Sequence, residues 1–451
     1  MSSVFIGIGS NVGDRLLHIQ NALALLITKS GIEQVVQTAF LYQSSPMYHT
    51  DQDVFLNTCA ELIVSVTPNE LLLILKCVEA EIGRIKSSVR NGPRSIDMDI
   101  LFFANNHIQE TSDLIIPHPR LQERSFVLAP LMDLCPNLIH PVLKKSISQL
   151  HAECGNESSC MQIIPGRVIW PMNKAHVMGI LNCTPDSFSD CQADEESALE
   201  RARVLVREGS DILDIGGEST NPKAKPVSEI EEQRRVVNVI KRIRKEFPHI
   251  VISIDTYKAS TAEKAILAGA DIVNDVSGGL MDPFMIPLVA SLKVPYVCMH
   301  GYKVGSVIIN EEGVFENVTT EEAIHSVDTI TRQLHARVAA CIQSGIYRWN
   351  IWVDPGLGFG KNANVSYAII YNWERMFAHF PKYPILFGAS RKRFVRDMQE
   401  GKTGTLEEAI LGTVVVTVGV GLKQRYPNFH RVHDVESVKR SLHIVSRMNG
   451  I

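Results

Sequence analysis

The alternation of hydrophobic and polar positions changes its rhythm along the chain. Up to about residue 150, segments with strand and helix patterns follow one another irregularly, and Pro68 after Thr67 is a typical helix start. In order, these segments are residues 4–9 (strand), 15–28 (helix), 34–43 and 54–66 (strands), 69–85 (helix) and 92–103 (strand). This order predicts an N-terminal α+β ferredoxin-like domain at residues 1–150.

After residue 168 the rhythm becomes regular, because short apolar runs alternate with helical patterns. The apolar runs are HVMGILN, DILDIGG, IVISIDT, DIVNDVS, VPYVCMH, NIWVDPG, PILFGAS and FHRVHDV. Such repeats over roughly 280 residues suit a C-terminal (β/α)₈ TIM barrel, which typically needs ~250 residues. A doubly wound sheet would also alternate, but no glycine-rich fingerprint follows the first strand. We therefore predict a barrel at 168–451, joined through a polar, aperiodic linker at 151–167.

Composition and charge narrow the class of protein. A hydrophobic content of 45% is typical of a globular protein, and a net charge of -4 gives no basic excess for nucleic acid. The nine cysteines form no C-x-x-C pair, which indicates reduced thiols. No stretch reaches ~18 unbroken apolar residues, and no presequence is visible. We expect a cytoplasmic enzyme of small molecules without membrane or nucleic-acid partners; mitochondrial location is the alternative.

Two carboxylates interrupt the apolar strand GPRSIDMDILFF at residues 92–103. Side chains alternate across a strand, so Asp97 and Asp99 should share one face. Two ionised carboxylates this close repel each other unless a cation is bound, and Mg²⁺ commonly takes one or two carboxylates beside substrate phosphates. The alternative is an exposed edge strand with an acidic outer face.

A basic, glycine-containing segment precedes this strand. Its cations are Arg84, Lys86, Arg90 and Arg94. Cations on a flexible loop beside a metal site suit polyphosphate chemistry, which requires charge neutralisation and a cover that opens. The early GIGSNVG has the wrong spacing for a dinucleotide fingerprint, and no G-x-x-x-x-G-K-[ST] lies near it.

Four motifs in this half together resemble 6-hydroxymethyl-7,8-dihydropterin pyrophosphokinase: GSNVGDR, FLN, GPRSIDMDILFF and IPHPRLQERSFVLAPL. That family moves a pyrophosphoryl group from ATP to the pterin hydroxymethyl and releases AMP. The resemblance implies that Asp97 and Asp99 hold two Mg²⁺ ions. It also implies nucleotide or phosphate contacts for Arg84, Lys86, Arg94, His118 and Arg124, and pterin contacts for Ser45, Asn57 and Phe126. Lys86, often Arg in the family, and Asn91, often aromatic, are departures.

In the second half, polar residues follow most of the predicted strands. The carboxyl ends of barrel strands normally carry function, so these side chains should form a ring on one face. Any one of them alone would more often be a cap or a turn residue. The ring comprises Asn182, Glu218, Asp255, Asn274, His300, Asp354, Ser390, Lys392, Arg431 and His433.

The motifs GILNCTPDSFSD, DIGGEST, SIDTYK, VNDVSGG, MH, DPGLGFGK, GASRK and RVHDV resemble, in this order, dihydropteroate synthase. That family joins p-aminobenzoate to the pterin pyrophosphate, so the two halves would catalyse successive steps of folate synthesis. The resemblance implies pterin binding by Asp255, Asn274, Asp354 and Lys392, and one Mg²⁺ on Asn182. It implies pyrophosphate contacts for Arg431 and His433 and a p-aminobenzoate pocket with Thr220 and Ser390. Asp255, Lys392 and Arg431 would be catalytic.

Two departures and two alternatives accompany this interpretation. Asn221 stands where the family often has Arg, and the segment after His300 lacks the usual G-x-P. A barrel that transfers methyl groups from folate to a corrinoid would share some Asp and Asn positions. A pterin-binding protein with one inactive half is the non-catalytic alternative. Barrels of the synthase family commonly dimerise through their helices, so a homo-oligomer is expected.

Overall fold

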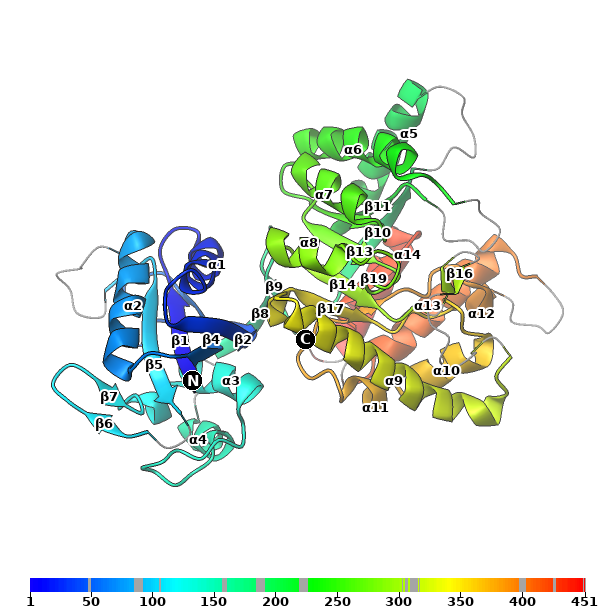
Figure 1. The fold of residues 1–451 in the computed structure, drawn as a ribbon. Coiled ribbons are helices and arrows are strands. Elements are labelled where there is room, and N and C mark those ends of the chain that lie inside the picture. The colour runs from blue at the N-terminus through cyan, green and yellow to red at the C-terminus, as the bar shows by residue number, and fades with distance from the viewer. Residues whose placement is uncertain are drawn as a thin grey trace. The chain divides into compact units, whose positions relative to one another are not determined.

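The chain divides into two compact units (Figure 1). Unit 1 comprises Met1–Pro165 with Tyr347–Trp349, and unit 2 comprises Gly166–Ile346 with Asn350–Ile451. The computed structural model describes residues 1–47, 50–84, 92–104, 107–155, 160–183, 191–218, 226–301, 303–304, 307–308, 315, 317–396, 403–424, 427–448 and 450. Each unit is described by itself below.

Unit 1 is built on an antiparallel sheet with the strand order β5-β1-β4-β3-β8, and β2 also pairs with β4. This is the order expected of the ferredoxin-like fold, which is therefore confirmed. Its strands are β1 (Ser2–Ser10), β2 (Ile32–Thr38), β3 (Leu41–Ser44), β4 (Phe55–Val64), β5 (Asp97–Phe103) and β8 (Cys160–Ile164), with a hairpin of β6 (Gln109–Glu110) and β7 (Ile115–Ile116). Its helices are α1 (Arg15–Leu26), α2 (Pro68–Glu81), α3 (Ser125–Leu134) and α4 (Ile147–Cys154), with a 3-10 turn at Leu121–Glu123.

Helix α2 begins where the sequence predicted. Thr67 and Glu70 form a capping box, and Pro68 occupies the first turn, where its missing N–H costs nothing. The buried side chains Leu71, Leu75 and Val78 face the sheet. The helix thereby lies beside β5, the strand that carries the two carboxylates.

The predicted linker at 151–167 is wrong for its first part. Helix α4 continues to Cys154, and β8 pairs antiparallel with β3 in the sheet of unit 1. Ile163 and Ile164 are buried there. The sequence did not predict this strand, because five residues are too few to show the two-residue periodicity of a strand and its partner β3 lies far away in the chain.

Unit 2 is a parallel barrel, as predicted. Its strand order is β17-β14-β13-β12-β11-β10-β19-β18, and a parallel bridge between Val353 and Ile385 connects the two ends of this sheet. The strands are β10 (His176–Asn182), β11 (Ile212–Gly216), β12 (Val251–Asp255), β13 (Ile272–Asp275), β14 (Tyr296–Met299), β17 (Ile351–Asp354), β18 (Leu386–Phe387) and β19 (Phe429–Val432). All eight apolar runs contain one of these strands.

Helices surround the barrel (Figure 1). They are α5 (Cys191–Arg207), α6 (Glu229–Glu246), α7 (Ala259–Ala268), α8 (Met285–Leu292), α9 (Thr320–Gln343), α10 (Ala363–Tyr371), α11 (Trp373–Phe377), α12 (Arg393–Arg396), α13 (Leu406–Gly421) and α14 (Val435–Met448). The remaining elements are a 3-10 turn at Arg348–Asn350 and the short strands β9 (Trp170–Pro171), β15 (Lys303–Val304) and β16 (Val307–Ile308). None of the described helices is both long and apolar enough to cross a membrane.

Candidate active sites in the two units

Unit 1 contains a cavity with about 770 Å³ of empty space, part of it open to solvent. Strands β1, β4 and β5 and the start of α3 contribute to its walls. Seven of the predicted site residues line it: Ser45, Asn57, Arg94, Asp97, Asp99, Arg124 and Phe126. The structure thus brings together most of the residues that the sequence predicted for this half.

The two carboxylates of β5 share a face, as predicted. Asp97 is opposite Gly9 and Asp99 is opposite Gly7 on β1. Both line the cavity, which excludes the alternative of an acidic outer face on an edge strand. Burial and then the negative charge of Asp97 raise the pKa of Asp99.

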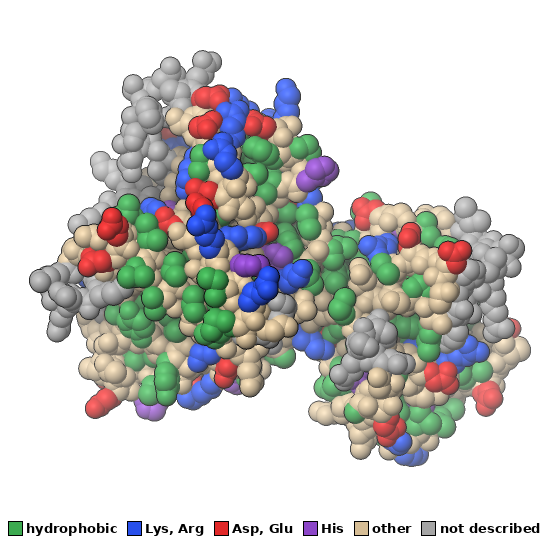
Figure 2. Space-filling model, turned by 180° about the vertical axis from the view of Figure 1, so that it is seen from behind, with side chains coloured by type: hydrophobic (Ala, Val, Ile, Leu, Met, Phe, Trp, Pro, Cys, Tyr) green, Lys and Arg blue, Asp and Glu red, His purple; other side chains and the backbone are tan. Residues whose placement is uncertain are grey.

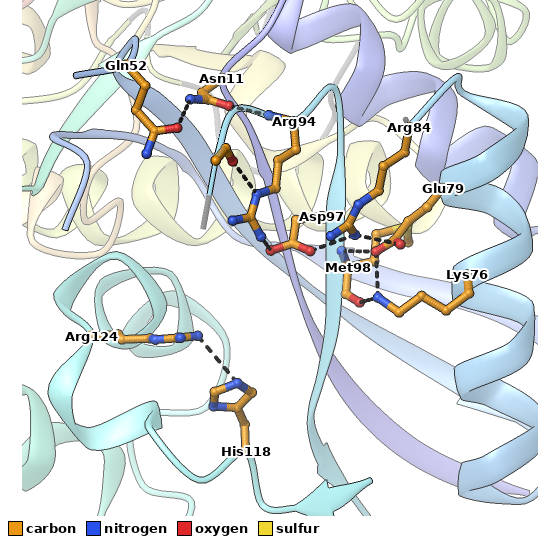
Figure 3. Close-up of polar contacts among 11 residues, drawn as sticks. Asn11, Gln52, Lys76, Glu79, Arg84, Arg94, Asp97, Met98, His118 and Arg124 are labelled. Carbon is orange, nitrogen blue, oxygen red and sulfur yellow. Dashed lines mark hydrogen bonds and ion pairs between the residues drawn. The ribbon is translucent and has the colours of Figure 1, made fainter. Parts of the chain in front are cut away.

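Two arginines hold Asp97, and Figure 3 shows how they converge on it. Arg84 donates to Oδ1 at 2.7 Å, and Arg94 donates to Oδ2 at 2.6 Å. Burial raises the pKa of Asp97, but the charges of Arg94, Arg84 and Lys76 outweigh it and leave the pKa below its ordinary value. The ionised form is therefore favoured more strongly at Asp97 than at Asp99.

Glu79 of α2 supports this arrangement from behind. Its buried carboxylate accepts from the Met98 backbone N–H at 2.7 Å, from Lys76 at 2.8 Å and from Arg84 at 2.6 Å (Figure 3). Glu79 thereby holds both Arg84 and the backbone between the two aspartates. The sequence reading missed Glu79, whose only signal is an acidic residue on the apolar face of a helix.

His118 and Arg124 form a second pair beside the cavity. Their side chains approach to 3.3 Å, and the charges of both lower the pKa of Asp99 against its burial. The Arg124 guanidinium also lies 5.7 Å from the centre of the Phe126 ring. Lys86, Arg90 and Asn91 lie outside the described residues.

A glycine of β1 makes room for Asn57 of β4. A Cβ added to Gly9 would lie 2.9 Å from the Asn57 Oδ1 atom, closer than real contacts allow. The buried Asn57 donates to Ser44 Oγ at 2.9 Å, which orients its amide toward the cavity wall formed by β3. The first motif, GSNVG, thus serves the site through steric room rather than as a nucleotide loop.

In unit 2, predicted residues gather at the carboxyl ends of the strands. Asp255 on β12 is in register with Asn274 on β13, so the two side chains lie at one level on one side of the sheet. Asp214 is two residues before Gly216, the register partner of Asp255, and therefore lies one layer deeper on the same side.

Arg431 of β19 connects these layers. Its Nε donates to Asp214 and its Nη2 donates to Asp255, both at 2.6 Å. Burial raises the pKa of Asp255 to about 7, although the Arg431 charge opposes this shift. The sequence reading missed Asp214, an acidic residue inside the apolar run DILDIGG.

Asp354 is buried, and the half-buried Lys392 lies near it. Asp354 accepts from the Gly356 N–H at 2.7 Å, and burial raises its pKa. Lys392 donates to the Leu357 carbonyl, and its Nζ lies 4.3 Å from the centre of the Phe359 ring. Burial lowers the pKa of Lys392 to about 7 against the attraction of Asp354 and Asp255.

The other predicted residues of this unit occupy nearby strand ends. Ser390 Oγ lies 3.0 Å from Nδ1 of His433 and accepts from the His433 N–H. Burial lowers the pKa of His433 to about 4. Asn182 is the exposed last residue of β10. Thr220, Asn221 and most of the segment after His300 lie outside the described residues.

Comparison with known proteins identifies the family. Residues 5–136 match the model of 7,8-dihydro-6-hydroxymethylpterin-pyrophosphokinase, and residues 178–424 match that of pterin binding enzymes. A folate synthesis bifunctional protein of Arabidopsis thaliana, named mitochondrial, is 38% identical over 96% of this chain and 80% of its own length. The chain belongs to the family of bifunctional folate-synthesis enzymes. Unit 1 is its pyrophosphokinase unit, and unit 2 is its synthase unit.

Two further relatives agree with this assignment. A folic acid synthesis protein of Schizosaccharomyces pombe is 39% identical over 86% of this chain, which spans only 52% of that protein. A Plasmodium falciparum HPPK-DHPS crystallised with pteroate shares the fold, with a TM-score of 0.77, 21% identity and coverage of 100% of this chain and 98% of that one. The corrinoid methyltransferase is not favoured, because it does not account for the pyrophosphokinase unit.

We expect Gly9→Ala to lower the pyrophosphokinase kcat/KM about tenfold, because the new methyl group would lie 2.9 Å from Asn57 Oδ1 and must displace the amide that lines the cavity. Gly7→Ala is the matched control on the same strand face, since the atoms nearest to its Cβ would be those of Leu101, from 3.4 Å, an ordinary contact distance. Steady-state AMP formation measures both. Equal activity of the two variants would contradict this account of Gly9.

Proposed function

We propose that each unit keeps a separate active site for one of two successive steps. The pyrophosphokinase cavity takes ATP and 6-hydroxymethyl-7,8-dihydropterin, and the synthase strand ends take the resulting pyrophosphate ester and p-aminobenzoate. The observation that carries this proposal is the gathering of carboxylates, arginines, Asn57 and Phe126 in one cavity. Cytoplasmic location stays a prediction.

In the first step, the pterin hydroxyl attacks the β-phosphorus of ATP and AMP leaves. Asn57 and Phe126 supply an amide and an aromatic face, which suit the edge and the plane of a pterin. Arg94 and Arg124 line the same cavity and would bind phosphate oxygens. Arg84 and Arg94 now neutralise Asp97, and we propose that they turn to the triphosphate when it binds.

The carboxylate pair fits a magnesium site. Asp97 and Asp99 present hard oxygen ligands on one face. Burial and the charge of Asp97 raise the pKa of Asp99, so a cation bound beside both carboxylates would relieve their repulsion. We propose that these two residues hold two Mg²⁺ ions. When bound, the ions would neutralise the charge of the phosphates.

In the second step, the synthase unit holds the flat pterin by its polar edge. Asp255 and Asp354 accept from its N–H groups, while Asn274 and Lys392 complete the edge. All four lie at the carboxyl ends of neighbouring barrel strands or just after them. Buried carboxylates with raised pKa values favour a ligand that donates hydrogen bonds.

Departure of pyrophosphate then needs positive charge and donors. Arg431 and His433 provide them, and Ser390 lies against His433 where p-aminobenzoate would approach, with Thr220 as its further proposed contact. Asn182, the exposed last residue of β10, is the proposed ligand of one Mg²⁺. The barrel contributes positioning and electrostatic stabilisation rather than a strong base.

We also propose a homodimer through the barrel helices. Exposed apolar side chains lie at Leu411 and Val415 on α13 and at Leu422, just after the end of α13, with spacings of four and seven residues. On α14, Ile444 and Met448 are exposed apolar residues. Gly421 packs near Val445, so the ends of these helices are neighbours. Figure 2 shows hydrophobic side chains gathered on the barrel unit. A second copy would cover such a surface.

The double variant Asp97→Ala/Asp99→Ala should lose AMP formation and retain the condensation of supplied pterin pyrophosphate with p-aminobenzoate. Lys392→Ala should show the reverse, which makes it the reciprocal control. A coupled assay with ATP, Mg²⁺, hydroxymethyldihydropterin and p-aminobenzoate measures AMP and dihydropteroate separately. Loss of both activities in one folded variant would contradict separate sites.

The pKa values of two groups predict a narrow pH optimum for the condensation. Asp255 is a pure, negatively charged acceptor only when ionised, above a pKa of about 7, and Lys392 donates as an ammonium only below a pKa of about 7. We therefore expect kcat/KM to fall about tenfold per pH unit on both sides of neutrality. A profile that is flat between about pH 6 and 8 would contradict these roles.

Val415→Glu should convert a dimer into a monomer, because a charge would be buried at the proposed interface. Light scattering after gel filtration should give twice the chain mass of 50.2 kDa for the wild type and the chain mass for the variant. Phe284→Glu, at an apolar residue 74% exposed near α8, is the matched control and should remain dimeric. A monomeric wild type would refute the dimer.

A further inference from the structure

Asp214 is fully buried in the synthase barrel, and no role in binding or catalysis follows from its motif. It lies on β11, in register with Ile180 of β10 and Ser253 of β12, one layer below Asp255 and Asn274. A buried carboxylate costs several kcal/mol unless it is paired, so its retention here requires an explanation.

One oxygen of Asp214 accepts hydrogen bonds from two residues of the proposed synthase site. Arg431 Nε donates to Oδ2 at 2.6 Å, and Asn274 Nδ2 donates to the same atom at 3.2 Å. The other oxygen, Oδ1, is buried without a hydrogen-bond partner among the described residues. Asp214 is therefore an acceptor directed at two side chains that face the ligand.

An ionised carboxylate can only accept hydrogen bonds, which fixes the orientation of Asn274. The NH₂ group of the Asn274 amide must point toward Asp214. The amide oxygen therefore points away from Asp214 and can accept a hydrogen bond from the ligand. Without a pure acceptor below it, the amide would be free to rotate by 180°. The donor and acceptor pattern presented to the pterin edge depends on this choice.

Asp214 also determines where the Arg431 guanidinium lies. The backbone of Arg431 is in register with Met178, which is in register with Ile212. Arg431 therefore begins one layer below Asp214, and its side chain extends past Asp214 to Asp255. The Nε bond to Asp214 holds the guanidinium plane while Nη2 reaches Asp255. Among the residues that the structure describes, Nη1 of this guanidinium has no hydrogen-bond partner and can donate to a ligand.

We propose that Asp214 is a positioning residue that fixes the amide orientation of Asn274 and anchors Arg431 beside Asp255. It acts through these two side chains and does not touch the substrate. When the pterin takes over the hydrogen bonds of Asp255, the anchor at Nε keeps Arg431 in place. This inference rests on the proposed synthase function.

The test compares Asp214→Asn with Ser253→Ala. Asn is nearly isosteric but can also donate, so it no longer forces the Asn274 amide and no longer carries the charge that holds Arg431. We expect the KM for the pterin pyrophosphate to rise about tenfold to a hundredfold, and the KM for p-aminobenzoate to stay within about twofold. Ser253 lies in the same layer with a buried hydroxyl that has no hydrogen-bond partner in the described structure, and its variant should match the wild type.

The pH profile separates positioning from a general loss of structure. The charged groups around Asp255 are Arg431, Asp214, Glu232, Asp275 and Lys392. If Asp214→Asn releases Arg431, the acid limb of kcat/KM moves to higher pH, because Asp255 loses its cation. If Arg431 stays on Asp255, that limb moves to lower pH, because a repelling carboxylate has gone; this result would overturn the proposal.

A second measurement needs no substitution in the barrel core. In wild-type protein with ¹⁵N-labelled arginine, we expect the Arg431 Nε–H hydrogen to exchange slowly both before and after 6-hydroxymethylpterin is added. Loss of its protection on ligand binding would overturn the anchor even if Asp214→Asn failed to fold. A wild-type protein that forms no dihydropteroate would overturn the proposed function. If the wild type is active and Asp214→Asn leaves the KM for the pterin pyrophosphate unchanged, only this inference is overturned.

Discussion

The structure depends on the neutralisation of carboxylates placed inside apolar strands. A buried negative charge is costly without a counter-charge, and both units meet this cost with arginine. In the pyrophosphokinase unit, Arg84 and Arg94 bind Asp97 from two sides. In the synthase unit, Arg431 bridges Asp214 and Asp255. Each ion pair allows an aspartate to lie within an otherwise apolar strand next to the hydrophobic core.

These pairings also explain how the sites can respond to their ligands. The arginines at Asp97 occupy the place where positive charge is needed, and they are the same groups that suit phosphate oxygens. Arg431 similarly holds Asp255, while its Nη1 has no partner within the described part of the chain. Substrate binding would thus exchange one set of charge partners for another rather than expose an unpaired charge. The buried acceptors Glu79 and Asp214 give Arg84 and Arg431, respectively, a second anionic partner besides Asp97 and Asp255.

Much of the fold could be predicted because it follows from local patterns. The eight barrel strands each fall inside an apolar run, and α2 begins at its capping box. Asp97 and Asp99 could be predicted to share one face because they interrupt a strand at a period of two, whereas Asn57 and Phe126 were expected only from the resemblance to the pyrophosphokinase family. Strand β8 could not, since five residues carry no period and its stability comes from pairing with β3.

The sequence by itself determined which residues alternate, which helices are capped and which acidic side chains break the apolar runs, because these are properties of neighbouring positions. Only the tertiary structure decided the partners of those side chains. The sequence does not distinguish Glu79 and Asp214 from other acidic residues, because their hydrogen bonds join segments that are distant in the chain. These bonds form only when α2 packs beside β5 and β19 pairs with β10. Burial and charge compensation are set by that packing, and so is the chemistry of the sites.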